Sequence, residues 1–424
     1  MNLYLGLGSN LGDRKATLEK ACVAISAISR VLRISSVCET PAMLPPGSTN
    51  DWNFPFLNLV LEVETNDSPL EFLQKTRQIE NSLGRVRTGK WSPRTIDIDL
   101  LHAFQKLDTE ELVLPHPGIF FRQFVLGPLA EIAPHLVIEG KSVREFSKTE
   151  PQFQPRLMGI LNITPDSFSD GGKHEALSDL EKTLNEWDQV QVSAVDIGGE
   201  STRPGAQLID EKAEWSRLSR TLEFIHSRYQ GKIIKPKISI DTRHAGTAEL
   251  AIEQGADIIN DVSGLSDPGM LQVLRGSHVE LVLMHSLSIP PTKEDVLLED
   301  CDPIEAVKVF FEQKINHLEA LGISRSRIIL DPGIGFGKTP LQSLVLLRRI
   351  QEFESLGCQI LCGHSRKSFM KSFMIGQLGA SPESSRDIET LGISFELSKK
   401  GVDWLRVHDP VLHHRAFLAG KQVI

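Results

Sequence analysis

The sequence is poor in cysteine and has no long apolar run. Its 424 residues include five scattered cysteines, Cys22, Cys38, Cys301, Cys358 and Cys362. The last two have three residues between them, which is not the spacing of a CxxC motif, so we expect buried thiols in a reducing compartment. No apolar stretch approaches bilayer-spanning length, and the first residues lack the pattern of a signal peptide. We expect a cytoplasmic protein without a membrane segment.

The sequence also has no excess of basic residues. The net charge is −9, and residues 1–150 hold 16 basic and 18 acidic residues, which leaves 30 and 37 for the rest. Neither half resembles a nucleic-acid-binding protein, so we expect small-molecule partners. A content of 40% hydrophobic and 24% charged residues is typical of soluble globular proteins. The length exceeds what one core usually supports and predicts two domains.

A polar, proline-containing stretch separates two halves of different pattern. It runs from Glu145 to Arg156 (EFSKTEPQFQPR) and contains Pro151 and Pro155. Such a stretch is typical of a linker. We place the linker at residues 147–155, between domains at 1–146 and 156–424.

Strand and helix patterns alternate before the linker. For example, Leu57, Leu59, Leu61 and Val63 alternate with other residues, as in a strand with one buried face. The elements are expected at Leu3–Leu7, Arg14–Ile28, Val31–Cys38, Phe56–Val63, Pro69–Leu83 and Thr95–Ala103. The resulting βαββαβ order predicts an open α+β sandwich of ferredoxin-like type.

After the linker, eight short apolar strands alternate with helical stretches over about 265 residues, which matches a TIM (β/α)8 barrel. Expected helices include Leu177–Val190, Ile304–Leu321 and Ser343–Phe353. The strands are expected to end near Ile163, Ile197, Ile240, Ile259, Met284, Leu330, Cys362 and Val407. Polar residues stand at these ends: Asn162, Asp196, Asp241, Asn260 with Asp261, His285, Asp331, Ser365 with Arg366 and Lys367, and Arg406 with His408. Because barrel active sites lie where the strands end, we expect these side chains to converge.

Two glycine-rich segments invite a nucleotide-binding interpretation. Gly6, Gly8 and Gly12 have GxGxxxG spacing, one residue longer than the dinucleotide fingerprint, and a plain glycine turn explains them equally well. The later segment Leu330–Thr339 differs from a P-loop because Pro332 stands where a glycine is needed and Pro340 interrupts the helix that should follow. A turn that lets a flat ligand approach closely fits it better.

Asp97 and Asp99 form a stronger signal. Residues i and i+2 of a strand face the same side, so the two carboxylates converge. Mg²⁺ on a polyphosphate needs such oxygen ligands, although a DxD pair alone is more often a polar strand face. Nearby Arg94, the GRVR segment and the PHP segment at 115–117 favour phosphoryl transfer, in which Arg and His side chains stabilise developing charge.

Residues 1–146 resemble the hydroxymethyl-dihydropterin pyrophosphokinases. The resemblance rests on YLGLGSNLGDR, FLNLVLEVET, GRVR, WSPRTIDIDL and LPHP. It implies ATP as co-substrate and Mg²⁺ as cofactor. The implied roles are magnesium ligands at Asp97 and Asp99, action on the pyrophosphoryl group by Arg85 and Arg94, and ATP contacts at His116 and Arg122.

The same resemblance implies a pterin site. The ring would stack between Phe56 and Phe124 and bond to Asn58 and to the backbone near Thr40 and Pro41. Without the resemblance, ordinary core packing would explain both phenylalanines. Glu111 departs from relatives that carry a basic residue there, which affects one expected ATP contact.

Residues from Leu157 onward resemble dihydropteroate synthase. Seven segments carry this resemblance: MGILNITPDSFSDGG, DIGGESTRPGA, ISIDT, IINDVSG, LDPGIGFGK, SRKS and LRVHD. The implied pterin contacts are Asp241, Asn260, Asp331 and Lys367, and the implied pyrophosphate contacts are Thr202, Arg406 and His408, with Asn162 on magnesium. The implied p-aminobenzoate pocket contains Phe168, Arg203, Pro204, Phe336 and Ser368, and Asp170 and Arg203 would lie on loops that close over the site.

The two resemblances together imply a bifunctional transferase. The first domain would pyrophosphorylate 6-hydroxymethyl-7,8-dihydropterin with ATP, and the second would condense the product with p-aminobenzoate. A homodimer through the barrel is also implied. Two alternatives remain at this point: an NAD-linked enzyme that uses the first glycines, and a non-catalytic pterin-binding scaffold. The loop after His285 departs from the synthase pattern, and no role is assigned to it.

Overall fold

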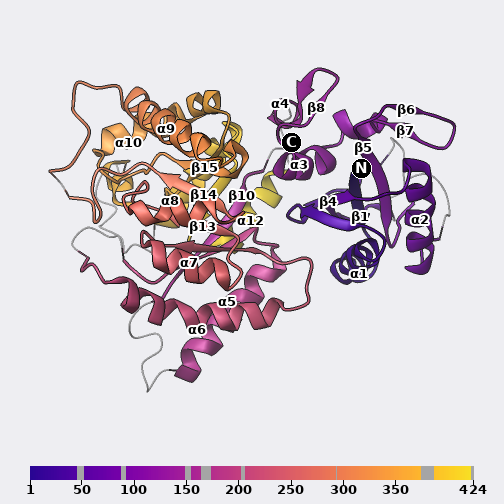
Figure 1. Cartoon of the computed structure of the whole chain (residues 1–424), viewed down its shortest axis with the longest axis horizontal. Coiled ribbons are helices and arrows are strands. Elements are labelled where there is room, and N and C mark those ends of the chain that lie inside the picture. The colour runs from indigo at the N-terminus through magenta and orange to yellow at the C-terminus, as the bar shows by residue number, and fades with distance from the viewer. Residues whose placement is uncertain are drawn as a thin grey trace. The chain divides into compact units, whose positions relative to one another are not determined.

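The computed structural model of the chain describes residues 1–44, 52–86, 92–148, 154–163, 173–201, 206–292, 294–373 and 386–421 (Figure 1). It divides into two compact units, Met1–Phe153 with Gly231–Lys235 and Gln154–Gln230 with Pro236–Ile424. Five residues with expected roles lie outside the described residues: Phe168, Asp170, Thr202, Arg203 and Pro204.

The first unit is built on an antiparallel sheet with the order β2–β4–β1–β5, to which β3 adds by pairing with β4. Its strands are β1 (Asn2–Ser9), β2 (Arg30–Ile34), β3 (Cys38–Thr40), β4 (Phe56–Glu64) and β5 (Asp97–Ala103). Its helices are α1 (Arg14–Ser26), α2 (Pro69–Ser82), α3 (Gln123–Ile132) and α4 (Val143–Lys148), with η2 at Pro117–Phe120. Two small hairpins complete it, β6 (Leu107–Asp108) with β7 (Val113–Leu114) and β8 (Val137–Ile138) with β9 (Lys141–Ser142).

The sheet has an apolar core on each face, because successive side chains of its strands point to opposite faces. Leu3, Leu5 and Leu7 of β1 pack with residues of α1 and α2, whereas Tyr4 packs on the other side with residues of α3 and α4. Helix α2 begins at Ser68, whose capping box with Glu71 satisfies free backbone N–H groups. The expected α+β sandwich and its βαββαβ order are confirmed, and the strand order is that of the ferredoxin-like fold.

Two expectations for this unit need correction. The strand expected at Val31–Cys38 is two strands, because Ser35 turns its hydroxyl to the backbone N–H of Val60 and interrupts the ladder. The polar stretch at 145–148 is helical, since Ser142 and Glu145 exchange capping bonds at the start of α4 and Ser147 is buried. Sequence reasoning expected no helix there.

The second unit is a closed, parallel eight-stranded barrel in which each strand pairs with the next and β17 pairs with β10. Its strands are β10 (Arg156–Asn162), β11 (Ala194–Gly198), β12 (Lys237–Asp241), β13 (Ile258–Asp261), β14 (Glu280–Met284), β15 (Ile328–Asp331), β16 (Gln359–Cys362) and β17 (Trp404–Val407). Every expected strand end lies within two residues of an observed end, and the predicted TIM barrel is confirmed.

Helices surround the barrel strands (Figure 1). They are α5 (Lys173–Gln189), α6 (Glu211–Tyr229), α7 (Ala245–Glu253), α8 (Pro268–Arg275), α9 (Pro303–Ala320), α10 (Pro340–Arg348), α11 (Asp387–Lys399) and α12 (Pro410–Lys421), with 3-10 turns η4 (Arg325–Arg327), η5 (Ile350–Leu356) and η6 (Ser368–Phe373). The helix expected at Ser343–Phe353 starts earlier and ends at Arg348, where η5 replaces it. Pro340 occupies its first turn, behind a capping box of Thr339 and Gln342.

Side chains fill the barrel interior. Seven strand residues form a fully buried layer: Met158, Ala194, Ile258, Val282, Ile329, Leu361 and Trp404. At the start of β10, Arg156 lies 4.0 Å above the Trp404 ring, and both side chains bond to Gln359. Among the described residues, these side chains fill the N-terminal end of the barrel.

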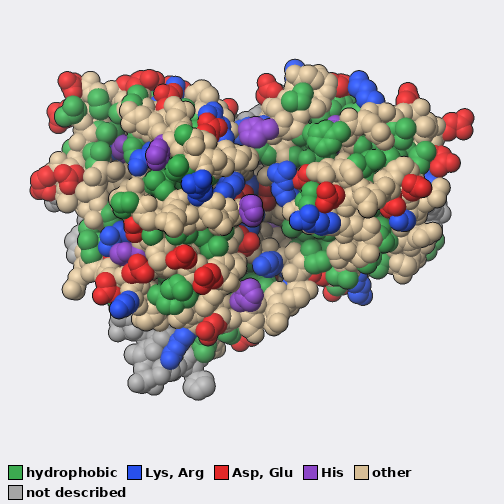
Figure 2. Space-filling view, in the orientation of Figure 1, with side chains coloured by type: hydrophobic (Ala, Val, Ile, Leu, Met, Phe, Trp, Pro, Cys, Tyr) green, Lys and Arg blue, Asp and Glu red, His purple; other side chains and the backbone are tan. Residues whose placement is uncertain are grey.

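The surface carries both signs of charge. Figure 2 shows basic and acidic side chains mixed over the face of each unit that it draws. In the part of the chain that the structure describes, no helix is both long and apolar enough to cross a membrane.

Candidate active sites

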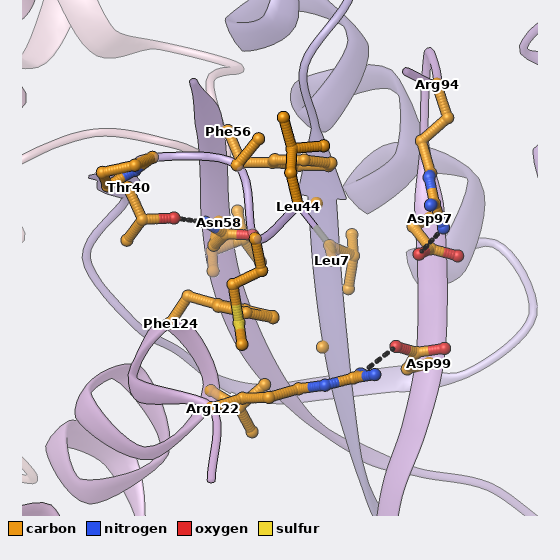
Figure 3. A pocket seen from close by; sticks show the side chains of 17 residues that line it. Leu7, Thr40, Leu44, Phe56, Asn58, Arg94, Asp97, Asp99, Arg122 and Phe124 are labelled. Atoms are coloured by element: carbon orange, nitrogen blue, oxygen red, sulfur yellow. Dashed lines mark hydrogen bonds and ion pairs between the residues drawn. The ribbon is translucent and has the colours of Figure 1, made fainter. Parts of the chain in front are cut away.

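Two cavities in the first unit share residues of strand β5. Asp97 and Asp99 line both of them. One cavity is also lined by Thr40, Pro41, Phe56, Asn58 and Phe124 (Figure 3), and the other by Arg85, Glu111 and His116. The residues expected for the pterin therefore lie on one side of the carboxylate pair, and two of those expected for the phosphates or ATP lie on the other.

Three arginines surround the two carboxylates. Asp97 receives hydrogen bonds from Arg85 at 2.5 Å and Arg94 at 2.6 Å, and Asp99 pairs with Arg122 at 3.4 Å. Arg122 and Arg94 reach the pair from opposite ends in Figure 3. With Glu80, which also pairs with Arg85, three cations face three carboxylates, and the arginines provide the donors that a polyphosphate needs.

The titration of these groups follows from burial and pairing. Burial and the neighbouring Asp97 raise the pKa of Asp99 to about 7. Burial would lower the pKa of Arg85, but Asp97 and Glu80 outweigh it and raise the pKa, so the guanidinium stays charged. Burial, assisted by Arg122, lowers the pKa of His116, whose Nδ1 accepts from the Gly118 N–H at 2.9 Å. A neutral His116 therefore carries its proton on Nε2, where it can donate to a ligand.

Glu80 is a residue of this site that sequence reasoning missed. It stands on α2, is only 3% exposed, and accepts a hydrogen bond from Arg85. The same oxygen accepts from the backbone N–H of Ile98, between the two aspartates, at 2.8 Å. Glu80 thus fixes both the arginine and the strand that carries the carboxylates. Its position on an otherwise apolar helix face is the only signal the sequence offers.

The pterin-side cavity has the shape of a slot. Phe56 and Phe124 point into it, and Asn58 between them donates to the Thr40 hydroxyl at 2.9 Å (Figure 3). A Cβ on Gly8 would lie 2.9 Å from the Asn58 amide oxygen, so a larger residue here would displace that side chain. Gly6 and Gly8 belong to β1 itself, so the glycine turn considered from the sequence does not explain them. Their function is to leave room, and not to form a turn.

The barrel brings most of its expected residues together where the strands end. Arg406 donates from Nε to Asp196 and from a terminal nitrogen to Asp241, both at 2.6 Å. Asn260 donates to Asp196 at 3.1 Å. Burial raises the pKa of Asp241 to about 7, although Arg406 favours its charged form. Burial would lower the pKa of Arg406, but Asp196 and Asp241 raise it instead.

Lys367 lies beside this cluster. Its ammonium group lies 4.4 Å from the centre of the Phe336 ring and donates to the carbonyl of Ile334. Burial lowers the pKa of Lys367 to about 8, while Asp331 opposes the shift. Burial also raises the pKa of Asp331, which accepts from the Gly333 N–H at 2.8 Å.

The remaining expected residues lie at the rim. Asn162 is exposed at the end of β10; a Cβ on Gly198 would be 3.6 Å from its amide oxygen and 3.7 Å from an Asp241 oxygen. His408 Nδ1 lies 3.0 Å from the Ser365 hydroxyl, and Ser368 is exposed in η6.

Lys338 and His285 form a buried pair that the sequence did not predict. Lys338 is 7% exposed and contacts the Nδ1 atom of His285 at 2.8 Å. It also donates to the carbonyls of His285 at 3.2 Å and Phe336 at 2.8 Å. Burial, assisted by Lys338, lowers the pKa of His285 to about 3, so the imidazole is neutral and accepts from the lysine. This lysine braces the loop between β15 and α10.

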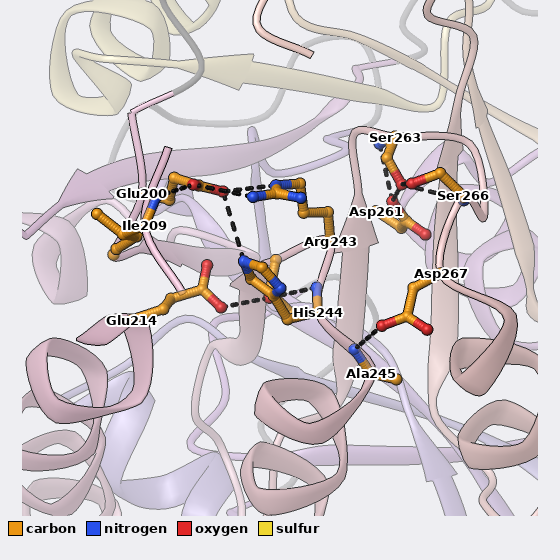
Figure 4. Close-up of polar contacts among 12 residues, drawn as sticks. Glu200, Ile209, Glu214, Arg243, His244, Ala245, Asp261, Ser263, Ser266 and Asp267 are labelled. Carbon is orange, nitrogen blue, oxygen red and sulfur yellow. Dashed lines mark hydrogen bonds and ion pairs between the residues drawn. The ribbon is translucent and has the colours of Figure 1, made fainter. Parts of the chain in front are cut away.

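A second set of carboxylates holds the loops after β11, β12 and β13 (Figure 4). Glu200 accepts from Arg243 at 2.8 Å and from the Ile209 N–H at 2.8 Å. Glu214 accepts from the Thr242 hydroxyl at 2.6 Å, and Asp267 from the Ala245 N–H at 2.9 Å. These bonds keep the rim of the barrel in a fixed arrangement.

The folds and sites define a two-domain transferase, with a phosphate-handling site in one unit and a polar barrel mouth in the other. Residues 158–408 match the family model of pterin binding enzymes and residues 4–134 match that of 7,8-dihydro-6-hydroxymethylpterin-pyrophosphokinases, so the chain belongs to the pterin binding enzymes and carries a pyrophosphokinase domain as well.

Known proteins of both architectures are similar to the chain. The folate synthesis bifunctional protein of Chlamydia caviae is 36% identical over 98% of this chain and 97% of its own length. The dihydropteroate synthase of Escherichia coli is 37% identical over 60% of this chain and 86% of its own length. The crystal structure of the Anaplasma phagocytophilum dihydropteroate synthase with bound 6-hydroxymethylpterin-monophosphate has 32% identity and a TM-score of 0.56, covering 64% of this chain and all of that one.

The chain therefore catalyses two consecutive reactions of folate synthesis. It pyrophosphorylates 6-hydroxymethyl-7,8-dihydropterin at the expense of ATP, and it condenses the product with p-aminobenzoate to give 7,8-dihydropteroate and pyrophosphate. This activity replaces both alternatives left by the sequence, the NAD-linked enzyme and the non-catalytic scaffold.

Proposed function

We propose that residues 1–146 are the pyrophosphokinase domain and residues 156–424 the synthase domain, joined by a linker at 147–155. The observation that supports the first assignment best is the position of Asp97 and Asp99 in the walls of two cavities at once. Transfer of a pyrophosphoryl group requires acceptor and donor to meet at one point. The pterin would lie between Phe56 and Phe124, with bonds to Asn58 and to the backbone near Thr40 and Pro41, and ATP would lie beside His116.

Charged residues of the kinase domain then act on the pyrophosphoryl group as it is transferred. Arg85 and Arg94 balance the charge that develops on the pyrophosphoryl oxygens, and both already bond to Asp97. The neutral His116 and the charged Arg122 bind and orient ATP. Glu111, which lines the same cavity, adds a negative charge and does not serve as the basic ATP contact of other family members.

Magnesium fits the donors of the kinase site. Asp97 and Asp99 project to one side of β5, and no group of three or more metal-binding side chains occurs among the described residues. Two carboxylates suit Mg²⁺, which takes further ligands from phosphate and water. When bound, it neutralises charge on the β- and γ-phosphates. In the barrel, the exposed Asn162 would hold the ion that accompanies the pyrophosphate.

In the synthase domain we assign the edge of the pterin ring to Asp241, Asn260, Asp331 and Lys367. Together these provide the donors and acceptors that a pterin edge needs. Arg406, His408 and Thr202 would bind the leaving pyrophosphate, and the nitrogen of p-aminobenzoate attacks the methylene carbon that it leaves. The p-aminobenzoate pocket would contain Phe168, Arg203, Pro204, Phe336 and Ser368, with Asp170 and Arg203 on closing loops. We also propose a cytoplasmic homodimer that associates through the barrel.

A coupled assay tests these assignments. Purified chain is given hydroxymethyl-dihydropterin, ATP, Mg²⁺ and p-aminobenzoate, and dihydropteroate is measured. Product should require all four, and chelation of Mg²⁺ should stop the first reaction. Product formed from hydroxymethyl-dihydropterin without ATP would contradict the assignment of the first domain. Elution of the chain as a monomer at micromolar concentration would contradict the dimer.

A further inference from the structure

Asp196 is a carboxylate in the synthase site for which the activity provides no direct role. It is 0% exposed at the middle of β11, so no substrate reaches it. It accepts from three side chains on three other strands: Ser239 on β12 at 2.5 Å, Asn260 on β13 at 3.1 Å and Arg406 on β17 at 2.6 Å. A buried charge with three polar partners is costly to bury and is fully paired here.

The two carboxylate oxygens of Asp196 have different partners. Oδ1 accepts from Ser239 alone, whereas Oδ2 accepts both the Nε of Arg406 and the amide of Asn260. One atom therefore fixes a residue proposed to bind pyrophosphate and a residue proposed to bind the pterin edge. Arg406 has five N–H donors, and its contacts with Asp196 and Asp241 use two of them. The structure shows no partner among the described residues for its other donors, which can meet a phosphate.

We infer that Asp196 is a positioning residue that holds Arg406 and Asn260 in a fixed mutual arrangement, so that the pyrophosphate and the pterin ring of one substrate are recognised together. This inference rests on the roles proposed above for Arg406 and Asn260. Asp241 differs from Asp196 in this respect. It also bonds to Arg406, but it stands at the end of its strand and can exchange that bond for a substrate, whereas Asp196 cannot.

The test compares Asp196→Asn with Ser239→Ala in the full chain. D196N keeps the shape but removes the charge and replaces one acceptor by a donor. S239A keeps the carboxylate and both bonds at Oδ2. The pyrophosphokinase rate of each preparation measures the amount of folded chain. D196N should raise the KM for dihydropterin pyrophosphate at least tenfold. When pyrophosphate and 6-hydroxymethylpterin are tested one at a time as inhibitors, D196N should weaken inhibition by each. The KM for p-aminobenzoate should change less than twofold, and S239A should change every constant less than threefold.

Non-additivity separates positioning from general loosening of the fold. With Arg406→Ala, adding D196N should weaken pyrophosphate inhibition no further, because the residue that Asp196 positions is already gone. Multiplied effects in the double variant, or a D196N effect shared equally by p-aminobenzoate, would overturn the inference. If R406A and Asn260→Ala leave the KM for dihydropterin pyrophosphate unchanged, the proposed substrate contacts are wrong. If they raise it and D196N does not, only the role of Asp196 is wrong.

The wild-type protein offers a second measurement should D196N not fold. In chain labelled with ¹⁵N-arginine, the Nε–H signal of Arg406 is identified by its loss in Arg406→Lys. A guanidinium held by Asp196 should give a signal that exchanges slowly with water and stays in place when pyrophosphate is added. Rapid exchange without ligand, or a large shift on adding pyrophosphate, would overturn the inference.

Discussion

The charged residues of both sites are paired with one another without any substrate. Arg85 and Arg94 bond to Asp97, and Arg406 bonds to Asp196 and Asp241. Such pairing fixes long side chains in advance, so that little ordering is left for the reaction. It also means that removing one carboxylate releases an arginine as well as a ligand.

Replacement of Asp97 by alanine should therefore stop the ATP-dependent step. We expect at least a 100-fold loss of pyrophosphokinase activity, comparable to losing one or more charge-stabilising contacts. The synthase rate of the same chain, measured with added dihydropterin pyrophosphate, should stay within twofold of wild type. Failure of the added intermediate to restore dihydropteroate would mean that Asp97 does not act in one domain alone.

The lowered pKa of Lys367 predicts a pH dependence of pterin binding. Above about pH 8 the ammonium group loses its proton, and with it the charge proposed to contact the pterin. Affinity for 6-hydroxymethylpterin should fall as pH rises through this value, measured by equilibrium titration from pH 6.5 to 9.5. In Lys367→Arg the fall should disappear, because arginine stays protonated. A wild-type affinity that is flat over this range would contradict the prediction.

Lys367 has the opposite effect on folding. Its pKa is lower in the folded chain than in the unfolded chain, so the unfolded chain binds more protons between about pH 8 and 10.5. In that window its contribution makes the folded state more stable as pH rises, while the site loses its donor.

The sequence predicted regular elements well and their loops poorly. Each barrel strand is a short apolar run with a polar residue at its end, so burial sets both its position and its limit. The predicted site residues at those ends, such as Asp331 and Lys367, come together for the same reason. Asp196 and His285 were predicted at strand ends, but their partners, like those of Glu80, lie on segments far apart in the chain, which no local pattern reveals. Short elements such as α4 were not predicted, because capping, and not periodicity, defines them.

The loop between β15 and α10 gives a test at this scale. Gly333 has φ of 66°, and a Cβ there would lie 2.0 Å from the carbonyl oxygen of His285, which Lys338 also contacts. Gly333→Ala should destabilise the barrel by more than about 2 kcal/mol, since a left-handed residue alone costs roughly 1–2 kcal/mol. The measurement is the free energy of unfolding in urea.

Gly335→Ala is the matched control. Gly335 has φ of 79°, but its nearest neighbour, the Cδ of Lys367, would be 3.5 Å from a Cβ, an ordinary contact. It should lose only the backbone cost of about 1–2 kcal/mol. Equal losses in the two variants would show that the close approach to His285 is not what requires glycine at position 333.

At the scale of the whole chain, we expect the intermediate to pass between the two domains through bulk water. It is an anion, and steering it would need a continuous path of basic side chains. Residues 1–150 and the rest are both net acidic, and the segment 145–156 holds as many acidic as basic residues. Joining the domains then serves to keep their amounts equal.

Mixing two disabled chains tests this expectation. Asp97→Ala lacks the first activity and Lys367→Ala is designed to lack the second. Free exchange predicts that the mixture makes dihydropteroate after a lag, and that intact chain at the same concentration of sites shows a similar lag. An intact chain without a lag, in which added dihydropterin pyrophosphate fails to compete, would require direct transfer.

The filled N-terminal end of the barrel has a consequence for the order of events. With Arg156 and Trp404 filling that end, we expect every reactant and product to use the end where the strands finish. Asp241, Asn260 and Asp331 are between 2% and 9% exposed, so a pterin bound to them is the first to be covered. p-Aminobenzoate that arrives early would obstruct its co-substrate. We expect substrate inhibition by p-aminobenzoate at low dihydropterin pyrophosphate, visible as falling initial rates and relieved by more of the pterin; rates that only saturate would mean that the two arrive in either order.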